Sequence, residues 1–249
     1  MSDAPDRRAA LVTGAAGGIG SAIARRLASD GFRVALADRD EAGLAGLAGE
    51  LSDAAIPVVV DVTVRSEVER MVQAVLDRWG RLDVLVNNAG RTRIGPFIDA
   101  PEEHWRELLE VDLLGVMRCT QVALPYMCRQ KWGRVINMAS DAARTGLPGQ
   151  TVYAAAKGAI IAFTKSLARE VAADNVLVNA VSPGPVNTPP LQRLFERQPD
   201  FARKLQEEIP LGRVAEVDDV AGMVSFLASE DARYITGQVL SVNGGWVTA

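Results

Sequence analysis

The sequence has few of the residues that build disulfide frameworks and metal sites. Its 249 residues include two cysteines, Cys119 and Cys128, and a single histidine, His104. The spacing of the cysteines matches no disulfide scaffold and no zinc motif. The histidine stands at a predicted helix start, without partners at the spacing of a catalytic triad or a metal site. We therefore expect no metal, and the unpaired cysteines fit a reducing compartment.

An excess of basic charge and long apolar runs are also missing. The 27 Lys and Arg residues against 31 Asp and Glu give a net charge of −4, which argues against nucleic-acid and membrane-surface partners. No apolar stretch is long enough to cross a bilayer, and the N-terminal MSDAPDRRAALVTG lacks the apolar core of a signal peptide. With 48% hydrophobic and 23% charged residues, the chain is expected to be globular, soluble and cytoplasmic.

Short apolar runs alternate with helical patterns along almost the whole chain. Runs rich in Val, Leu and Ile, several of them apolar at consecutive positions, are typical of parallel strands buried on both faces. They predict strands at 9–13, 33–38, 56–61, 83–87, 133–140, 176–182 and 238–244, with helices at 18–30, 40–51, 65–79, 102–128, 152–173 and 216–229. This alternation predicts an α/β fold with a parallel sheet covered by helices on both sides.

One long region departs from the alternation. Prolines interrupt the start of residues 182–213, and a charged amphipathic stretch follows. Because long insertions in compact domains are usually functional, we expect a substrate lid at about residues 189–210.

Glycines cluster where the first predicted strand meets the first predicted helix. The stretch TGAAGGIG contains Gly14, Gly18 and Gly20, where side chains would keep a diphosphate from the backbone N–H groups and the helix N-terminus. The spacing is G-x-x-x-G-x-G rather than G-x-G-x-x-G, and glycines serve any tight turn. The position at the first strand-to-helix turn is the context that predicts nucleotide binding.

Acidic residues end the second and third predicted strands. Asp38 could accept hydrogen bonds from the adenosine ribose hydroxyls and would repel a 2′-phosphate. The glycine turn has no Lys or Arg for that phosphate, although Arg39 is a counter-signal. We therefore predict NAD rather than NADP. Asp61 could reach the adenine edge, and both aspartates have a helix-capping or turn-capping role as the alternative.

Tyr153 and Lys157 are four positions apart in TVYAAAKGA. Residues at i and i+4 share one face of a helix, and the intervening alanines add little bulk. The pair could therefore face one cavity, although on this stretch alone a surface helix is the preferred interpretation.

Five motifs in order resemble the short-chain dehydrogenase/reductase family: TGAAGGIG, NNAG (87–90), Ser140 after the fifth strand, YAAAK, and SPGPVNTP (182–189). The match extends over essentially the whole chain. It implies a single Rossmann-type domain over 1–249, with a doubly wound sheet of seven parallel strands and a nicotinamide cofactor along their carboxyl ends.

The resemblance also implies roles for individual residues. Tyr153 would be the general acid/base, Lys157 its electrostatic partner and ribose anchor, and Ser140 the group that binds the substrate oxygen. The implied cofactor contacts are Gly14, Gly18, Ile19, Gly20, Asp38, Asp61, Val62, Asn88, Ala89, Gly90, Tyr153, Lys157, Pro183, Gly184, Val186 and Thr188. A nearby cation stabilises a phenolate, so Tyr153 could take the hydroxyl proton while hydride leaves the carbon.

One position departs from the family pattern. Members commonly carry Asn in a VNLTG-like stretch, where it completes a catalytic tetrad through a bound water, whereas this chain reads VDLLG with Asp112. A carboxylate can still accept from that water, so Asp112 is counted among the catalytic residues. It would also offset part of the Lys157 field, which predicts an activity optimum displaced toward alkaline pH.

The segments expected to contact substrate are rich in arginine. Ser140, Arg144, Gln150 and Arg93 are the predicted substrate residues, and Arg91, Arg193 and Arg197 lie in the same segments. Arginine suits carboxylate and phosphate recognition, so an anionic or acyl-thioester substrate, such as a hydroxy acid or hydroxyacyl thioester, is one hypothesis. Exposed arginines are common, and ordinary surface arginines are the preferred interpretation.

Two groups of the family are similar to this chain: alicyclic hydroxyacyl-CoA dehydrogenases and 3-oxoacyl-carrier-protein reductases. The second group usually prefers NADPH and often has a basic residue where this chain has Asp174. An NAD-linked oxidation of a secondary alcohol is therefore preferred to carrier-protein reduction. A non-catalytic dinucleotide sensor is the alternative of a different class, and family members commonly form homotetramers.

Overall fold

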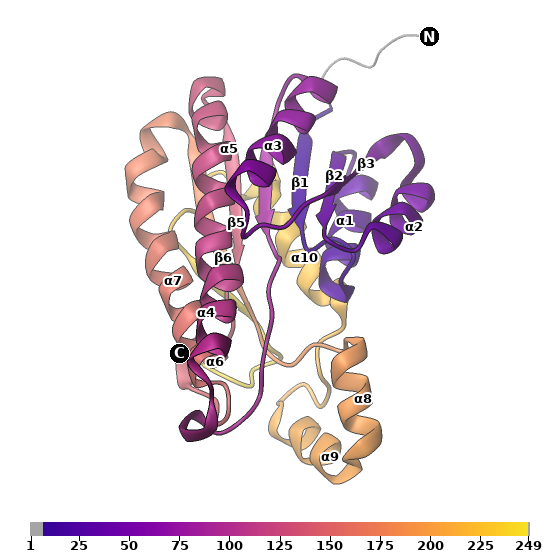
Figure 1. The fold of residues 1–249 in the computed structure, drawn as a ribbon, viewed down its shortest axis with the longest axis vertical. Coiled ribbons are helices and arrows are strands. Elements are labelled where there is room, and N and C mark those ends of the chain that lie inside the picture. The colour runs from indigo at the N-terminus through magenta and orange to yellow at the C-terminus, as the bar shows by residue number, and fades with distance from the viewer. Residues whose placement is uncertain (1–6, 249) are drawn as a thin grey trace.

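The fold is built on a single parallel sheet (Figure 1). The computed structural model describes residues 7–248; residues 1–6 and 249, which the single-domain prediction includes, lie outside the described part. Within it, seven strands pair in the order β3-β2-β1-β4-β5-β6-β7. They are β1 (Ala9–Thr13), β2 (Arg33–Asp38), β3 (Ala55–Val59), β4 (Val84–Asn87), β5 (Gly133–Met138), β6 (Val176–Pro183) and β7 (Val239–Val242). The predicted doubly wound α/β sheet is confirmed.

Helices cover both faces of the sheet. Because the parallel strands are apolar on both sides, both sides must be buried. One face carries α1 (Gly18–Ser29), α2 (Glu41–Leu51) and α10 (Val217–Ala228); the other carries α3 (Arg65–Trp79), α5 (Val116–Gln130) and α7 (Thr151–Val171). Along β1, Ala10 and Val12 face the first layer, whereas Ala9 and Leu11 face the second. All four are fully buried.

The predicted helix at 102–128 is interrupted in the structure. It consists of α4 (Glu102–Leu109), a π-helical segment (Glu110–Gly115) and α5. A π-helical turn holds more residues than an α-helical one and so changes the direction of the side chains within it. Asp112 lies in this segment and is fully buried. The expectation of one continuous helix is therefore wrong at the position that matters for the site.

The long insertion between β6 and α10 is mostly helical. It contains α8 (Pro189–Arg197) and α9 (Pro199–Glu208), each with proline in its first turn, where no hydrogen bond is lost. Buried Leu205, Ile209 and Val214 hold the two helices against Trp246 near the C-terminus. In Figure 1 the pair extends away from the sheet. The sequence patterns did not predict these helices or α6 (Ala142–Thr145).

Four short 3₁₀ turns occur in the described residues, at Ser52–Ala54, Phe97–Asp99, Ala172–Asp174 and Glu230–Ala232. None of the helices between residues 7 and 248 is both long and apolar enough to span a bilayer.

Candidate functional site

The carboxyl ends of parallel strands meet at one edge of a sheet, so the loops that follow them lie together. The predicted site residues fall on these loops and on the helix starts behind them: after β1, β2, β4, β5 and β6, and on α7. Strand order places β4 beside β1 and β5 beside β4. The strand order reverses between β1 and β4, which is the position where doubly wound sheets bind ligands.

The turn after β1 requires glycine for two reasons. Gly14 has φ +67°, in the left-handed region. A Cβ on Gly20 would lie 2.0 Å from the Gly14 carbonyl oxygen, so no other residue fits there. The side-chain amide of Asn88 donates to the carbonyl oxygens of Thr13 and Gly14 at 3.0 and 3.1 Å. The NNAG segment thus fixes the glycine turn from the neighbouring strand.

The hydroxyl of Thr13 joins the same two loops. Its Oγ1 accepts from the N–H groups of Asn88 and Ala89, both at 3.0 Å, and donates to the carbonyl oxygen of Val86 at 3.3 Å. Thr13 is buried. The role of this threonine was not predicted from the sequence, although its place directly before Gly14 was a usable signal.

The start of α1 fits a phosphate group. Gly17 precedes the helix without a side-chain cap, and the first turn contains no acidic residue. By contrast, α2 begins with Asp40, whose carboxylate accepts from the N–H of Gly43 at 3.1 Å. Among residues 7–248, no carboxylate uses the first N–H groups of α1 or its positive dipole end, as a diphosphate site requires. A nicotinamide dinucleotide fits this end of the sheet.

Asp38 lies at the end of β2, and its side chain reaches the loop between β1 and α1. Its Oδ2 accepts from the N–H of Ala16 at 3.1 Å, and its Oδ1 from the N–H groups of Arg39 and Asp40 at 2.7 and 3.1 Å. The guanidinium of Arg39 lies 3.6 Å from Asp61. The cation that could meet a 2′-phosphate is therefore paired with a carboxylate. Asp61 follows β3, which ends at Val59, and its Oδ1 accepts from Thr63.

Three contacts fix the ammonium of Lys157 in the interior. Lys157 is 3% exposed, and its Nζ donates to the carbonyl oxygen of Met138 at 2.9 Å. Nζ also lies 3.1 Å from Oδ1 of Asp112 and 5.7 Å from the ring centre of Tyr153. The predicted partnership of Tyr153 and Lys157 on one face of α7 agrees with this geometry. The direct ion pair with Asp112 differs from the contact through water that the resemblance implies.

Asp112 is a buried carboxyl with compensation from two sides. Burial raises its pKa; the positive charge of Lys157 and the N–H of Arg91, at 3.0 Å from Oδ2, lower the pKa without cancelling that effect. Oδ1 contacts Lys157 without the alignment of a hydrogen bond. A Cβ on Gly90 would lie 2.8 Å from the same oxygen, so this glycine of NNAG leaves space for the ion pair.

Ser140 follows β5 and precedes α6. Its Oγ accepts from the N–H of Ala142 at 3.2 Å, which leaves the hydroxyl hydrogen free to point elsewhere. Tyr153 is in the first turn of α7 and partly buried, and Gln150 is the residue before that helix. The segment after Ser140 is joined to the segment after NNAG by the bond from the N–H of Gly95 to the carbonyl oxygen of Gly149.

The segment after β6 approaches the glycine turn. A Cβ on Gly18 would lie 3.5 Å from Cγ2 of Thr188. Gly184 has no room for a side chain because its Cβ would lie 2.9 Å from that of Asn243. Val186 is buried and pairs with Ala215 in an isolated bridge. The predicted nicotinamide-side residues therefore lie between the glycine turn and the base of α8.

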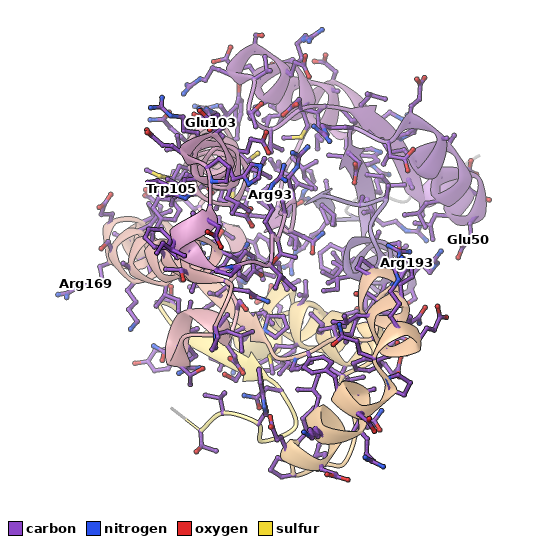
Figure 2. All side chains as sticks on the ribbon, turned by 60° about the horizontal axis from the view of Figure 1, so that its bottom comes forward. Glu50, Arg93, Glu103, Trp105, Arg169 and Arg193 are labelled. Atoms are coloured by element: carbon purple, nitrogen blue, oxygen red, sulfur yellow. The ribbon has the colours of Figure 1, made fainter. Side chains whose placement is uncertain are left out.

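The predicted substrate arginines are engaged by other groups. Arg93 donates to Glu107 at 2.6 Å, and Arg91 lies 3.9 Å from the same carboxylate. Arg144 donates to the hydroxyl of Ser241 at 2.7 Å. In Figure 2, Arg93 lies beside α4, the helix of Trp105 and Glu103, whereas Arg193 lies on α8 at the other side of the view. The structure does not gather these arginines around one anion.

The sequence interpretation overlooked one buried carboxylate at this edge. Asp141, next to Ser140, is fully shielded from solvent and accepts from three side chains of the last two strands and the tail. The available signal was polar residues at the ends of otherwise apolar strands: Ser182, Ser241 and Asn243.

Comparison with known proteins found a matching family model and several similar enzymes. A family model described as enoyl-(acyl carrier protein) reductase matches residues 14–247. The 3-oxoacyl-[acyl-carrier-protein] reductase FabG of Thermotoga maritima is 41% identical over 240 residues, covering 95% of this chain and 96% of that protein. The 2,3-dihydroxy-2,3-dihydro-p-cumate dehydrogenase of Pseudomonas putida is 40% identical over 240 residues, covering 95% and 93%. The FabG reductase of Haemophilus influenzae is 39% identical over 236 residues, covering 95% and 96%.

Proposed function

Because the chain belongs to the short-chain dehydrogenase/reductase family, we propose that it interconverts a secondary alcohol and its ketone by hydride transfer, with NAD as the preferred cofactor. The observation that supports this best is the placement of Tyr153 on the same helix face as the buried ammonium of Lys157. Ser140 follows β5, and the last residue of that strand, Met138, provides the carbonyl oxygen that holds Lys157.

The chain's own residues account for the proton and for the orientation of the substrate. In the oxidation, Tyr153 takes the hydroxyl proton, and the hydroxyl of Ser140 holds the same oxygen. The ammonium of Lys157 lies 5.7 Å from the ring centre of Tyr153, on the helix face where this proton transfer would take place. A bound nicotinamide dinucleotide supplies the acceptor for the hydride that leaves the carbon. The N–H groups at the start of α1 would hold its phosphates, and Asp38 its adenosine ribose.

The preference for NAD rests on the surroundings of Asp38. Its two carboxylate oxygens accept three backbone N–H groups, which keep the carboxylate beside the glycine turn. A 2′-phosphate would meet this charge, and the nearest candidate cation, Arg39, is shared with Asp61. Because Asp38 would repel a 2′-phosphate and Arg39 is paired with Asp61, the site favours the cofactor that has a 2′-hydroxyl.

The ion pairs described above argue against an anionic substrate. A carboxylate or phosphate bound at Arg93 would compete with Glu107. We therefore propose an uncharged secondary alcohol first, with hydroxy acids and hydroxyacyl thioesters as further candidates.

The alternative is a 3-oxoacyl-carrier-protein reductase that uses NADPH, as the identity to the FabG relatives suggests. One observation counts against it. Lys131, near the ends of α5 and α7, forms an ion pair with Asp174, so an acidic carrier protein that approached these helix ends would meet a carboxylate beside the cation.

We propose a homotetramer, which the family resemblance implies. Leu114 and Met117, at the junction of the π-helical segment and α5, are 36% and 40% exposed. Ala155 and Ala162 are exposed on α7. Small and apolar residues on two neighbouring long helices permit close packing of a second copy.

The experiment that tests the proposal is reduction of NAD⁺ and of NADP⁺ across neutral secondary alcohols, hydroxy acids and hydroxyacyl thioesters. We expect turnover with NAD⁺ on neutral alcohols, and at least about tenfold lower kcat/KM with NADP⁺, which corresponds to about 1.4 kcal/mol. Preference for NADP⁺ together with reduction of a 3-oxoacyl thioester would replace the proposal with the carrier-protein alternative.

A matched variant separates an enzyme from a dinucleotide sensor. Tyr153→Phe keeps the ring and removes the proton-transferring hydroxyl. It should lower kcat by about 10²–10⁴-fold, the range of general acid–base catalysis, while dinucleotide affinity measured by calorimetry stays within about threefold. Dinucleotide binding by the parent without turnover of any alcohol or ketone would instead support the sensor.

A further inference from the structure

A buried carboxylate next to Ser140 connects three parts of the candidate site. Asp141 is 0% exposed. Its Oδ1 accepts from the hydroxyls of Ser182 at 2.8 Å and Ser241 at 3.0 Å, and its Oδ2 accepts from the side-chain amide of Asn243. These donors come from β6, β7 and the residue after β7. A carboxylate at the end of β5 therefore bonds to the two strands that follow β5 in the sheet.

The charge of Asp141 has an indirect counter-ion. Arg144 donates to Ser241 Oγ at 2.7 Å, and that hydroxyl donates to the carboxylate. A buried carboxylate is costly unless hydrogen bonds satisfy its oxygens, and here two hydroxyls, one amide and this relay supply them. Removing the charge or one donor would leave a polar group without a partner inside the protein.

The backbone around Asp141 fixes the segment that would contact the nicotinamide. The N–H of Asp141 donates to the carbonyl oxygen of Pro183 at 3.1 Å, and the N–H of Gly184 to that of Val242 at 3.0 Å. With the bond from Ser182 to Asp141, the start of the 182–188 segment is held from both neighbouring strands. Any shift of Asp141 moves this segment relative to Ser140.

Asn243 extends the connection to the lid. Its side chain accepts from the N–H of Gly245 at 3.0 Å and donates to the carbonyl oxygen of Val247 at 2.8 Å, which shapes the tail into a turn. The carbonyl oxygen of Gly244 in this turn accepts from the N–H of Leu211, in the loop that follows α9, at 3.1 Å. Trp246 packs into the apolar cluster of α8 and α9.

We propose that Asp141 is a positioning residue that fixes Ser140, the 182–184 segment and the C-terminal turn at 243–247 as one unit, and thereby sets the base of the lid. The inference deepens the proposed function and rests on it for its kinetic part. Its structural part is independent of any substrate.

The first test is Asp141→Asn. This change replaces one carboxylate oxygen by an N–H₂ donor. The new donor then faces another donor, either the amide of Asn243 or the serine hydroxyls. Asn243 cannot rotate to compensate, since its two bonds in the tail fix its orientation. We expect kcat to fall by about ten- to a hundredfold, the cost of a small misplacement of reacting groups. Dinucleotide affinity should fall by a smaller factor than kcat, because the glycine turn and Asp38 are untouched and only the segment at 182–184 on the nicotinamide side is displaced.

A matched control tests whether the loss reflects general destabilisation. Asp83 is also 0% exposed and hydrogen-bonded, but it precedes β4, at the opposite edge of the sheet, and binds Arg81 and the N–H of Ala9. Asp83→Asn should lower the melting temperature yet leave kcat within about twofold. An equal loss of kcat in both variants would overturn the positioning role.

A double variant tests the specific contact. Asp141→Asn with Asn243→Asp exchanges donor and acceptor across the pair. It restores the bond between the two side chains but not the bond to the carbonyl oxygen of Val247, so it should regain only part of the lost activity, with kcat at least about threefold above that of Asp141→Asn. Asn243→Asp alone, which opposes two carboxylates, should have a lower kcat than Asp141→Asn. Absence of any recovery would overturn the role of this contact. If Asp141→Asn does not fold, Ser182→Ala removes one donor and should lower kcat at least threefold; parent-like kcat would overturn the inference.

Hydrogen exchange followed by mass spectrometry distinguishes the inference from the proposed function. In Asp141→Asn, amides of 182–184 and 243–247 should exchange faster than in the parent and in Asp83→Asn. A parent without turnover on any substrate contradicts the proposed function alone. Unchanged exchange in these two segments contradicts the inference alone.

Discussion

At the scale of single residues, we propose that Asp112 offsets part of the charge that Lys157 presents to Tyr153. The carboxylate lies 3.1 Å from the ammonium, inside the protein, where charges interact more strongly than in water. Asp112→Asn keeps the shape and removes the negative charge. The acidic limb of the pH–rate profile for alcohol oxidation should then move by about half to one unit to lower pH, the direction in which an uncompensated cation acts. Asp83→Asn is the control, and an unmoved limb in Asp112→Asn would contradict the electrostatic role.

The same substitution has a signature in stability. Burial raises the pKa of Asp112 above its value in the unfolded chain, so the folded protein binds the proton more tightly. Lowering the pH through the folded pKa therefore stabilises the fold, and the gain is complete below the unfolded pKa. The free energy of unfolding of the parent minus that of Asp112→Asn should increase as pH falls, by about 1.4 kcal/mol for each pH unit between the two pKa values. Urea titrations at several pH values measure this difference, and a constant value would mean that burial does not dominate.

At the scale of elements, the turn from β1 to α1 has no tolerance for a side chain. Gly20→Ala would place Cβ 2.0 Å from the Gly14 carbonyl oxygen. We expect a loss of at least about 2 kcal/mol in the free energy of unfolding, as in overpacked cores, together with loss of dinucleotide binding. Gly46→Ala in α2 is the matched control, because nothing lies within 4 Å of a Cβ at that position. The higher helix propensity of alanine should raise its free energy of unfolding by about 0.5–1 kcal/mol. Chemical denaturation and calorimetry report both, and parent-like binding by Gly20→Ala would refute the steric argument.

The elements also show which features the sequence could predict. Strands and most helices follow from local apolar patterns, and all seven predicted strands are present within the described residues. The π-helical segment was missed because Val111, Leu113 and Leu114 are compatible with either kind of helix. The ion pair between Arg93 and Glu107 spans 14 residues across a loop, and Asp141 takes its donors from 41, 100 and 102 residues away. Such contacts depend on tertiary packing, which no local pattern encodes.

At the scale of the whole molecule, the proposed homotetramer predicts where a charge would be tolerated. Met117 on α5 and Phe226 on α10 are 40% and 38% exposed, and they belong to helices on opposite faces of the sheet. If α5 packs against a second copy, Met117→Asp should bury a charge in that interface. The mass measured by light scattering should then fall to that of a dimer or monomer. Phe226→Asp should leave the mass unchanged. A parent that is already monomeric would exclude the tetramer.

The strand order also constrains how the chain is made. β1 is paired with β2 on one side and with β4 on the other, where Ala10 faces Val84. A nascent chain emerging from the ribosome can close the first side early, but the second edge of β1 has no partner until residues 84–87 have left the exit tunnel. During that interval an apolar edge is open to pairing with another chain. The rate of folding should therefore be limited by the pairing of β1 with β4, which are far apart in the sequence. Aggregation would compete with folding while the chain is still being synthesised.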